Sequence, residues 1–442
     1  MTEELSLRSI PVFGIGSAIA DLSLLCDVPS RLVSLPLSVV GQTPLNQHLK
    51  DLPVRLLDRA PGIGDLVVFD LIEDGSFPEL EVFAGQRIPL IVGRSYIGVC
   101  GESNSMSHFT SDLSLLSKGH REWDLISVAG MVGHVTSHSR DLEIELGCGR
   151  PAKLRARGTL CHDNTDQPIN TLREKGHFGI DSNPPLRADV PSVIAIFGTT
   201  TNVGKTTTAQ QLIAHLRRRT LCGAIKATGT GSFGDTKHHL QAGALAASNF
   251  IRHGLPSTYS LPDALLVNLF HSMIDEVEAS LAGMANGKLG SRLVRRSAVV
   301  LTEFGGDLIG AGNLAFLSDR SCLSRTLATV ICSDNAVAAI GAIEILRRHQ
   351  PDGRQPPVFL AMPLVNPEAF YRRMKPYIDK GMVAGIFDIN RPETMRTEED
   401  VRAYAISGAA IFSVEKLADE LVVLAQEFSE INHSRDWAMS AR

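Results

Sequence analysis

The pattern most suited to chemistry in this sequence is a glycine-rich segment followed by lysine and threonine. The segment reads IAIFGTTTNVGKTTTAQQL from 194 to 212, and its glycines Gly198 and Gly204 enclose five residues. The common phosphate-binding loop has four residues at this place, before Gly-Lys-Thr. The extra residue lengthens the mouth of the loop and leaves Gly204, Lys205 and Thr206 in order, so the sequence predicts a variant of that loop.

The residues around the loop predict a strand before it and a helix after it. Apolar residues fill 193–196, and Ala209, Leu212 and Leu216 repeat at helical spacing. The free N–H groups and dipole at the start of such a helix attract an anion. Lys205 can then reach the β and γ phosphates of a nucleotide, and the Thr206 hydroxyl can ligate Mg²⁺. The predicted phosphate contacts are Gly198, Thr199, Thr201, Asn202, Val203, Gly204, Lys205, Thr206 and Thr207.

Strands and helices alternate in the pattern of the C-terminal part. Apolar runs predict strands at 192–197, 222–227, 298–302, 327–332, 357–362 and 382–387. Helical spacing predicts helices at 204–219, 236–253, 335–348 and 367–378, and a last amphipathic helix with Leu417, Leu421, Leu424 and Phe428 on one stripe. This alternation is typical of a parallel α/β sheet with helices on both faces, whose ligands bind at the carboxyl ends of the strands.

The first 175 residues have a different texture. The runs PVFGIG, LVVFDLIEDG, LEVFAG, IPLIVG, YIGVC, LEIELGCG and AKLRARGTL are short and separated by turn residues, which favours strands in a mainly β domain with few helices. His134 and His138 are expected to be solvated loop residues rather than metal ligands. Residues 176–191 combine Gly, Pro, Asn and Asp and are predicted to link this domain to an α/β domain at 192–442.

Composition excludes several classes of function. The chain has 442 residues, 44% of them hydrophobic, and a formal net charge of −5, so it has no general attraction to nucleic acid. Its start shows neither a signal peptide nor an apolar span, and its seven cysteines form no C-x-x-C pair. We therefore expect a cytoplasmic protein with no nucleic-acid or membrane partner.

The loop spelling G-T-x-T-x-V-G-K-T resembles that of dethiobiotin synthetase, the ATP-dependent carboxylase of biotin synthesis, and of its relatives in the P-loop class. Those relatives include the family of the D-glutamate N-acetyltransferases. The resemblance covers about 192–370. It implies a P-loop fold, ATP and Mg²⁺ as cofactors, a small-molecule substrate and a homodimer with the site at its interface.

The resemblance implies roles for several residues after the second predicted strand. Lys226 lies where the family has a lysine that steadies the transferring phosphoryl group and the substrate. The following KATGTG places Thr230 at the family's substrate-binding serine, with Thr228 nearby. Asp235 is the candidate for the family's Mg²⁺-binding aspartate, although capping of the following helix explains it equally well.

The third predicted strand, VVLTEFGGD, resembles the family's V-E-G-A-G-G run. Glu303 would then bind Mg²⁺, and a carboxylate that ends a buried strand is costly to bury unless it meets a cation. Gly305 and Gly306 would leave room for substrate, while Phe304 replaces a small residue of the family. In PVFLAMPLVNP, Asn366 corresponds to the asparagine that meets the adenine.

These residues lead to a hypothesis of phosphoryl transfer. With Lys205, Lys226 and Glu303 as catalytic residues, we expect an ATP- and Mg²⁺-dependent kinase or ligase that acts on a carboxylate-bearing or amino-acid-like molecule, through an acyl phosphate where it ligates. His238 and His239 are candidates for a base or a substrate contact. The N-terminal domain is expected to close over the site or to help select the substrate. Two alternatives stay open: an amino-acid N-acyltransferase whose loop holds the phosphates of acetyl-CoA, and a regulatory P-loop ATPase.

Overall fold

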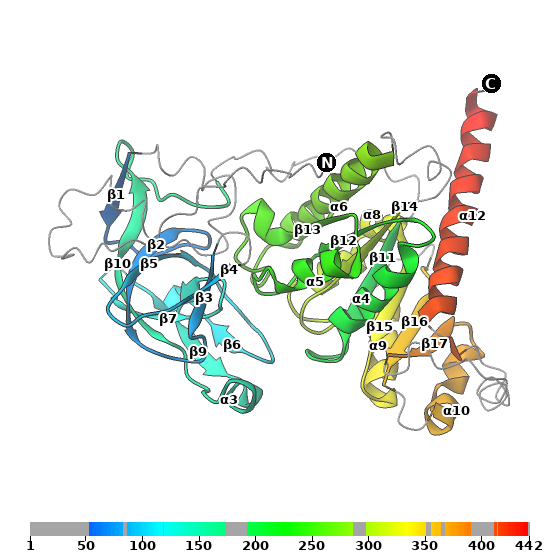
Figure 1. Cartoon of the computed structure of the whole chain (residues 1–442), viewed down its shortest axis with the longest axis horizontal. Helices are drawn as coiled ribbons and strands as arrows, with labels where there is room; N and C mark the ends of the chain where they lie inside the picture. Colours follow the sequence, from blue (N-terminus) through cyan, green and yellow to red (C-terminus); the bar gives the residue numbers. More distant parts are fainter. Residues whose placement is uncertain are drawn as a thin grey trace, which may run out of the picture.

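The computed structural model describes residues 53–82, 86–117, 119–173, 192–285, 298–350, 355–363, 367–389, 411–412 and 414–440. Within these ranges the chain forms a β-rich N-terminal part and a C-terminal α/β sheet (Figure 1). The run PVFGIG, the predicted linker 176–191 and Asn366 lie outside the described residues. The predicted domain limits therefore stay predictions.

The N-terminal part is built on a sheet of the order β1-β10-β2-β5-β8-β7, in which only the described pair β5–β8 is parallel. Its strands are β1 (Val54–Leu57), β2 (Leu66–Glu73), β5 (Ser95–Cys100), β7 (Glu122–Leu125), β8 (Met131–Gly133) and β10 (Lys153–His162). Two antiparallel ribbons accompany it, β3 (Glu79–Val82) with β4 (Gln86–Pro89) and β6 (Phe109–Ser111) with β9 (Val135–His138). The mainly β character predicted for this part is confirmed.

One predicted strand of this part is a helix. The run LEIELGCG lies in and just after α3 (Arg140–Leu146). The Ser139 side chain caps its first turn by accepting a hydrogen bond from the Asp141 N–H, and Gly147 ends it in the left-handed conformation at φ 70°. These local signals prevail over the alternation of apolar residues, because only Leu142 is buried while Ile144 is exposed.

The C-terminal part is a parallel sheet flanked by helices. Its strands are β11 (Val193–Gly198), β12 (Leu221–Lys226), β13 (Ala246–Asn249), β14 (Ala298–Glu303), β15 (Thr326–Cys332), β16 (Val358–Met362), β17 (Gly385–Asp388) and β18 (Ile411–Phe412). Its helices are α4 (Lys205–Leu216), α5 (Gly234–Ala242), α6 (Asp263–Ala285), α7 (Asn313–Ser318), α8 (Arg320–Arg325), α9 (Ala336–His349), α10 (Pro367–Ile378) and α12 (Val414–Ser440). The predicted parallel α/β class is confirmed.

The strand order β13-β12-β14-β11-β15-β16-β17-β18 determines where a ligand can bind. From β11 the chain passes β14 and continues to β12, towards the β13 edge of the sheet. From β14 it passes β11 and continues to β15, towards the opposite edge. The direction of the connections therefore reverses at the β11–β14 pair. In open α/β sheets, the crevice beyond the carboxyl ends of the strands at such a reversal is the usual ligand site.

Helices cover both faces of this sheet. Successive residues of a strand point to opposite faces, and apolar residues of β11 lie on both, so both faces have to be covered. On β11, Ala195 and Phe197 belong to the apolar cluster that includes residues of α6, α7 and α9, while Ile194 and Ile196 pack with α4 and α12. Figure 1 shows α4 and α12 in front of the sheet. Phe304 also points into the core, where its ring stacks on Phe197 with centroids 4.2 Å apart.

The region 236–285 differs most from the predicted elements. The predicted helix 236–253 is α5, then β13, then a 3-10 turn at Phe250–His253. Gly243, at φ 104°, ends α5 and lets the chain turn back to pair with β12. The sequence pattern also gave no element at α6, whose apolar face includes Met273, Val277 and Leu281 in the core.

An apolar contact joins the two parts. One buried cluster contains Val54, Leu66 and Ile97 from the N-terminal sheet together with Phe250 and Leu255 from the segment after β13. Hydrogen bonds reinforce this contact. The Thr171 hydroxyl donates to the Gly254 carbonyl at 2.6 Å, and the Ser257 hydroxyl donates to the Glu102 carbonyl at 2.6 Å.

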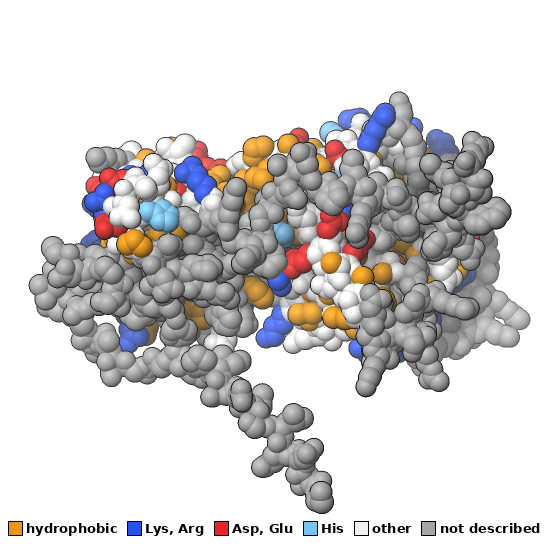
Figure 2. Space-filling model, turned by 90° about the horizontal axis from the view of Figure 1, so that it is seen from above, with side chains coloured by type: hydrophobic (Ala, Val, Ile, Leu, Met, Phe, Trp, Pro, Cys, Tyr) orange, Lys and Arg blue, Asp and Glu red, His pale blue; other side chains and the backbone are white. Residues whose placement is uncertain are grey.

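The surface seen in Figure 2 carries basic, acidic and apolar side chains interspersed among the described residues. Among the described helices, none is both long enough and apolar enough to cross a membrane. His138 lies on β9 with its side chain exposed, and His134 is half-buried just before that strand.

The last helix packs on the α/β sheet through the predicted stripe. Leu417 and Leu421 are fully buried and Leu424 packs against the same cluster, while the side chain of Phe428 lies outside the described residues.

We predict that Leu421→Ala lowers the free energy of unfolding by about 2–5 kcal/mol, because it leaves a cavity between α12 and the sheet. Val423, 47% exposed, is the control, and Val423→Ala should change the free energy of unfolding by less than about 0.5 kcal/mol. Urea denaturation followed by circular dichroism measures both, and equal effects would show that α12 does not pack in this way.

Candidate functional site

The glycine-rich segment forms a tight turn between β11 and α4, and its two glycines are required by close contacts. A Cβ on Gly198 would lie 2.8 Å from the Lys205 ammonium nitrogen. Gly204 has φ 92°, and a Cβ there would lie 2.6 Å from Cδ1 of Ile389. Asn202 adopts the left-handed conformation at φ 58°. The additional residue is therefore accommodated by left-handed backbone, and α4 still begins at Lys205.

Lys205 folds back over this turn. Its ammonium group donates to the carbonyl oxygens of Thr200 and Gly306, both at 2.7 Å. Burial, together with the nearby positive charge of Lys226, lowers the pKa of Lys205 to about 8. Both hydrogen-bond partners are neutral, so this lysine has a positive charge that no carboxylate neutralises directly.

A second charged cluster lies at the ends of the neighbouring strands β12 and β14. The ammonium group of Lys226 is 2.8 Å from Glu303 Oε1 and 2.7 Å from Asp235 Oδ2. Glu303 is completely buried, and its other oxygen lies 2.9 Å from His239 Nε2. The hydroxyl of Thr206 completes the cluster by donating to Glu303 Oε1 at 2.8 Å.

The charges of this cluster hold one another ionised. Burial alone would raise the pKa of Glu303, but Lys226 and His239 outweigh it and the pKa is lowered. Burial would likewise lower the pKa of Lys226, yet Asp235 and Glu303 raise it above the ordinary value of lysine. A carboxylate and an ammonium therefore face each other at neutral pH.

The oxygens of Thr206, Asp235 and Glu303 could hold Mg²⁺. They are hard oxygen ligands, the type that this ion prefers. Thr206 Oγ1 and Glu303 Oε1 are 2.8 Å apart, near the spacing of about 3.0 Å between adjacent oxygens of an octahedron with metal distances of about 2.1 Å. Asp235 Oδ1 is 3.4 Å from Thr206 Oγ1. The oxygen types fit the ion, but the Lys226 ammonium contacts the same Glu303 oxygen and would have to move for Mg²⁺ to bind there. The assignment of these residues as ligands stays a prediction.

The alternative role of Asp235 as a helix cap is wrong in this structure. The N-cap position of α5 is Phe233, and no side chain forms a cap hydrogen bond there. Asp235 lies within the first turn and directs its carboxylate to Lys226 and Thr206.

The substrate residues predicted from the resemblance have different positions. Thr230 and both Gly305 and Gly306 line the pocket described below, whereas Thr228 does not. The Thr228 hydroxyl donates to Asn313 Oδ1 at 2.6 Å and accepts from the Gly305 N–H at 2.9 Å. It positions the backbone of the glycine turn, and this placement does not fit a role in substrate binding.

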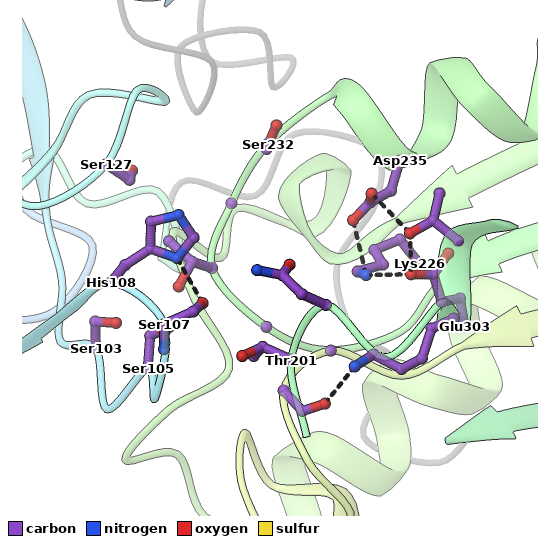
Figure 3. Close-up of a pocket in the computed structure, with 18 of the residues that line it drawn as sticks. Ser103, Ser105, Ser107, His108, Ser127, Thr201, Lys226, Ser232, Asp235 and Glu303 are labelled. Atoms are coloured by element: carbon purple, nitrogen blue, oxygen red, sulfur yellow. Dashed lines mark hydrogen bonds and ion pairs between the residues drawn. The ribbon is translucent and has the colours of Figure 1, made fainter. Parts of the chain in front are cut away.

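The loop and the charged cluster open into one pocket of about 550 Å³ (Figure 3). Of the predicted phosphate contacts, those at the mouth of the loop line this pocket: Thr201, Asn202, Gly204, Lys205, Thr206 and Thr207. Gly198 and Val203 lie underneath, and the Thr199 N–H donates to the Cys332 carbonyl. Lys226, Asp235 and Glu303 also face the pocket.

The opposite wall comes from the N-terminal part, which was expected at the site, although none of the wall's residues was predicted. It contains Ser103, Ser105, Ser107, His108 and Ser127, and Tyr259 of the α/β part lies near it. The density of serine in GESNSMSH was the available signal, but a serine-rich turn does not indicate which surface it will face. The two histidines that were considered have other positions: His239 is buried against Glu303, and His238 is exposed outside the pocket lining.

Comparisons with known proteins add little. Neither a protein-family model nor a curated protein matches the chain. Among solved structures, an apo-form GTPase from Pyrococcus abyssi matches with a TM-score of 0.26 and 13% identity, over 55% of this chain and 98% of that one. The 54 kDa signal recognition particle protein of Aeropyrum pernix, in complex with GDP, matches with a TM-score of 0.23 and 16% identity, over 59% and 53% respectively. TM-scores this low do not establish a shared fold, and they give no support to the resemblance of the loop to dethiobiotin synthetase.

The buried ion pair gives a prediction about stability. Replacing Lys226 by Met leaves the carboxylate of Glu303 buried without its cation, which should lower the free energy of unfolding by about 3–5 kcal/mol. Lys237, exposed on α5, is the matched control, and Lys237→Met should have an effect below about 0.5 kcal/mol. Chemical denaturation of both variants measures the difference. A Lys226→Met variant as stable as the control would contradict this account of the cluster.

Proposed function

We propose that this protein binds a Mg²⁺-nucleoside triphosphate at the loop 198–206 and transfers its γ-phosphoryl group to a small carboxylate-bearing or amino-acid-like acceptor. The enzyme would be a kinase, or a ligase that forms an acyl phosphate. ATP is the proposed nucleotide because of the resemblance in the loop.

The observation that carries the proposal is the convergence of two chemically different groups on one pocket. Lys205 brings a positive charge held only by two carbonyl oxygens. Thr206, Asp235 and Glu303 bring oxygen ligands suited to Mg²⁺ beside it. Transfer of a phosphoryl group requires this combination, because catalysis consists mainly of positioning the group and stabilising its charge.

The geometry indicates what each residue does when the nucleotide binds. Phosphate oxygens are anionic and accept stronger hydrogen bonds than carbonyls, so Lys205 can exchange Thr200 and Gly306 for the β and γ phosphates. The first N–H groups of α4 can bind the same phosphates. Bound Mg²⁺ would supply further positive charge to the phosphates. Lys226 lies against the carboxylates that would hold the ion, and from there it can steady an anionic acceptor.

Binding and turnover measured with candidate nucleotides would test the proposal. ATP and GTP, each with Mg²⁺, are titrated into the full-length protein by calorimetry, and ADP or GDP release is then followed with small carboxylates and amino acids. Nucleotide turnover that requires such an acceptor supports the proposal. Thioester consumption without nucleotide turnover would indicate an acyltransferase, and turnover changed only by a protein partner would indicate a regulatory ATPase.

Lys205→Ala is predicted to lower turnover by at least about 100-fold, because it removes the cation that stabilises the transferring phosphoryl group. The fold should be retained, since the lysine contacts only two carbonyls at the edge of an open pocket. Circular dichroism checks the fold, and Lys237→Ala is the control with an exposed lysine. A Lys205→Ala variant with normal turnover would refute the proposed role of the loop.

The lowered pKa of Lys205 predicts how nucleotide affinity changes with pH. Because the pKa of Lys205 is about 8, the side chain is mostly charged at pH 7 and mostly neutral at pH 9. If the charged form binds phosphate, affinity should fall about tenfold between these values. Tyr259, whose pKa burial raises to about 12, stays protonated throughout. The arginine of Lys205→Arg stays charged over this range, so the nucleotide affinity of this variant should be nearly the same at pH 7 and pH 9. Calorimetry at pH 7, 8 and 9 makes the comparison, and equal slopes for both proteins would count against the prediction.

A further inference from the structure

The pocket wall opposite the phosphate-binding loop carries several hydroxyl groups beside the apolar side chains of Phe77, Ile126 and Val128. Residues 101–108, which follow β5, bring Ser103, Ser105 and Ser107 to the pocket, and residue Ser127 comes from the turn before β8. All four serines line the pocket and are at most 9% exposed. Buried hydroxyl groups require hydrogen-bond partners, and that of Ser127 has none among the described residues.

A chain of hydrogen bonds orders this wall. Tyr259 bonds to Ser105, whose hydroxyl is 3.4 Å from that of Ser107. The hydroxyl of Ser107 is 2.9 Å from His108 Nδ1, and the imidazole stacks on Phe77 with centroids 6.1 Å apart. The ring of His108 is therefore held on one side by Ser107 and on its face by Phe77. Nε2 is the ring nitrogen that remains for a ligand in the pocket (Figure 3).

The two sides of the pocket differ in charge. Among the described residues that line it, Lys205, Lys226, Asp235 and Glu303 all belong to the α/β part, and the N-terminal part contributes no Asp, Glu, Lys or Arg. Burial lowers the pKa of His108, although Glu145 opposes the effect, so its ring is neutral at pH 7. This wall can hydrogen-bond a ligand, but its described lining residues offer no cation to balance an anionic group.

Contacts place this wall within reach of the phosphate-binding loop. The side-chain amide of Asn202, in the loop, donates to Glu145 Oε1 at 2.9 Å, and the same carboxylate acts electrostatically on His108. At the other end, a Cβ on Gly306 would lie only 3.4 Å from the Tyr259 hydroxyl. The Gly306 carbonyl in turn accepts from Lys205. A small molecule can therefore touch both sides at once.

We propose that Ser105, Ser107 and His108 form an acceptor subsite that binds an uncharged, hydrogen-bonding group, such as a hydroxyl or a carboxamide. This inference rests on the proposed function, because the loop and Lys226 position the reacting carboxylate of the acceptor. The other end of the acceptor then meets the serine wall, with His108 Nε2 contacting its polar group. An acceptor with a second anion at this end would find no counter-charge there, because Glu145, the charged residue that acts on His108, is itself negative.

Four amino acids that share one carboxylate end test the subsite. The full-length protein with Mg²⁺ and a non-hydrolysable ATP analogue is titrated by calorimetry with L-serine, L-asparagine, L-alanine and L-aspartate. L-Serine or L-asparagine should bind at least about tenfold more tightly than L-alanine and L-aspartate, because only their side chains can hydrogen-bond to the serine wall and to His108 Nε2 without adding a charge.

Two variants separate ligand contact from structure. His108→Phe keeps a ring for packing on Phe77 but removes both nitrogens, and it should abolish the tenfold preference while leaving the affinity for the analogue unchanged. His138→Phe, at an exposed position outside the pocket lining, should leave the preference intact.

The outcomes distinguish this inference from the proposed function. Equal or tighter binding of L-alanine or L-aspartate, an unchanged preference in His108→Phe, or no binding of any of the four would overturn the subsite while the nucleotide still binds. If the ATP analogue itself does not bind, the proposed function fails. The four amino acids are then titrated without the analogue, and the subsite is supported only if L-serine or L-asparagine again binds more tightly than L-alanine and L-aspartate.

Discussion

The buried ion pair of Lys226 and Glu303 is the interaction on which the site depends. In the parallel ladder of β12 and β14 these two residues are register partners, so backbone pairing alone brings both to the carboxyl edge of the sheet. A shift of one residue would turn either side chain to the opposite face, where an unpaired buried charge costs several kcal/mol. Pairing of the charges thus favours the correct register, and the register supplies the geometry to which Thr206, Asp235 and His239 add.

The pocket combines a charged floor and an uncharged wall, and each has a separate origin in the chain. The floor comes from strand ends and helix starts of one parallel sheet, where dipoles and charges accumulate for geometric reasons. The wall comes from a turn of the β-rich part, whose serines are ordered by one another and by Tyr259. Such a division would suit the proposed reaction, in which one side binds polyphosphate and the other recognises the acceptor.

The sequence was most informative where function and local structure use the same residues. The loop, the strand that ends in Lys226 and the strand that ends in Glu303 could be predicted, because apolar runs followed by a charged residue mark the carboxyl edge of a parallel sheet. Thr228 and Thr230 could not be separated, since only the position of Asn313, more than 80 residues later, shows that Thr228 is engaged. The helix α3 and the serine wall were missed for a similar reason: alternation does not reveal a cap, and spacing does not reveal contacts between distant segments.

The apolar cluster that runs from the N-terminal sheet into the segment after β13 affects how a ligand could enter. Rotating the two parts away from each other would expose Val54, Leu66 and Phe250 to water and break the hydrogen bond between Thr171 and Gly254. The hydrophobic cost of that exposure opposes a hinge. A ligand is therefore expected to enter and leave through side-chain rotation and movement of short turns at the rim, while the two sheets stay in contact.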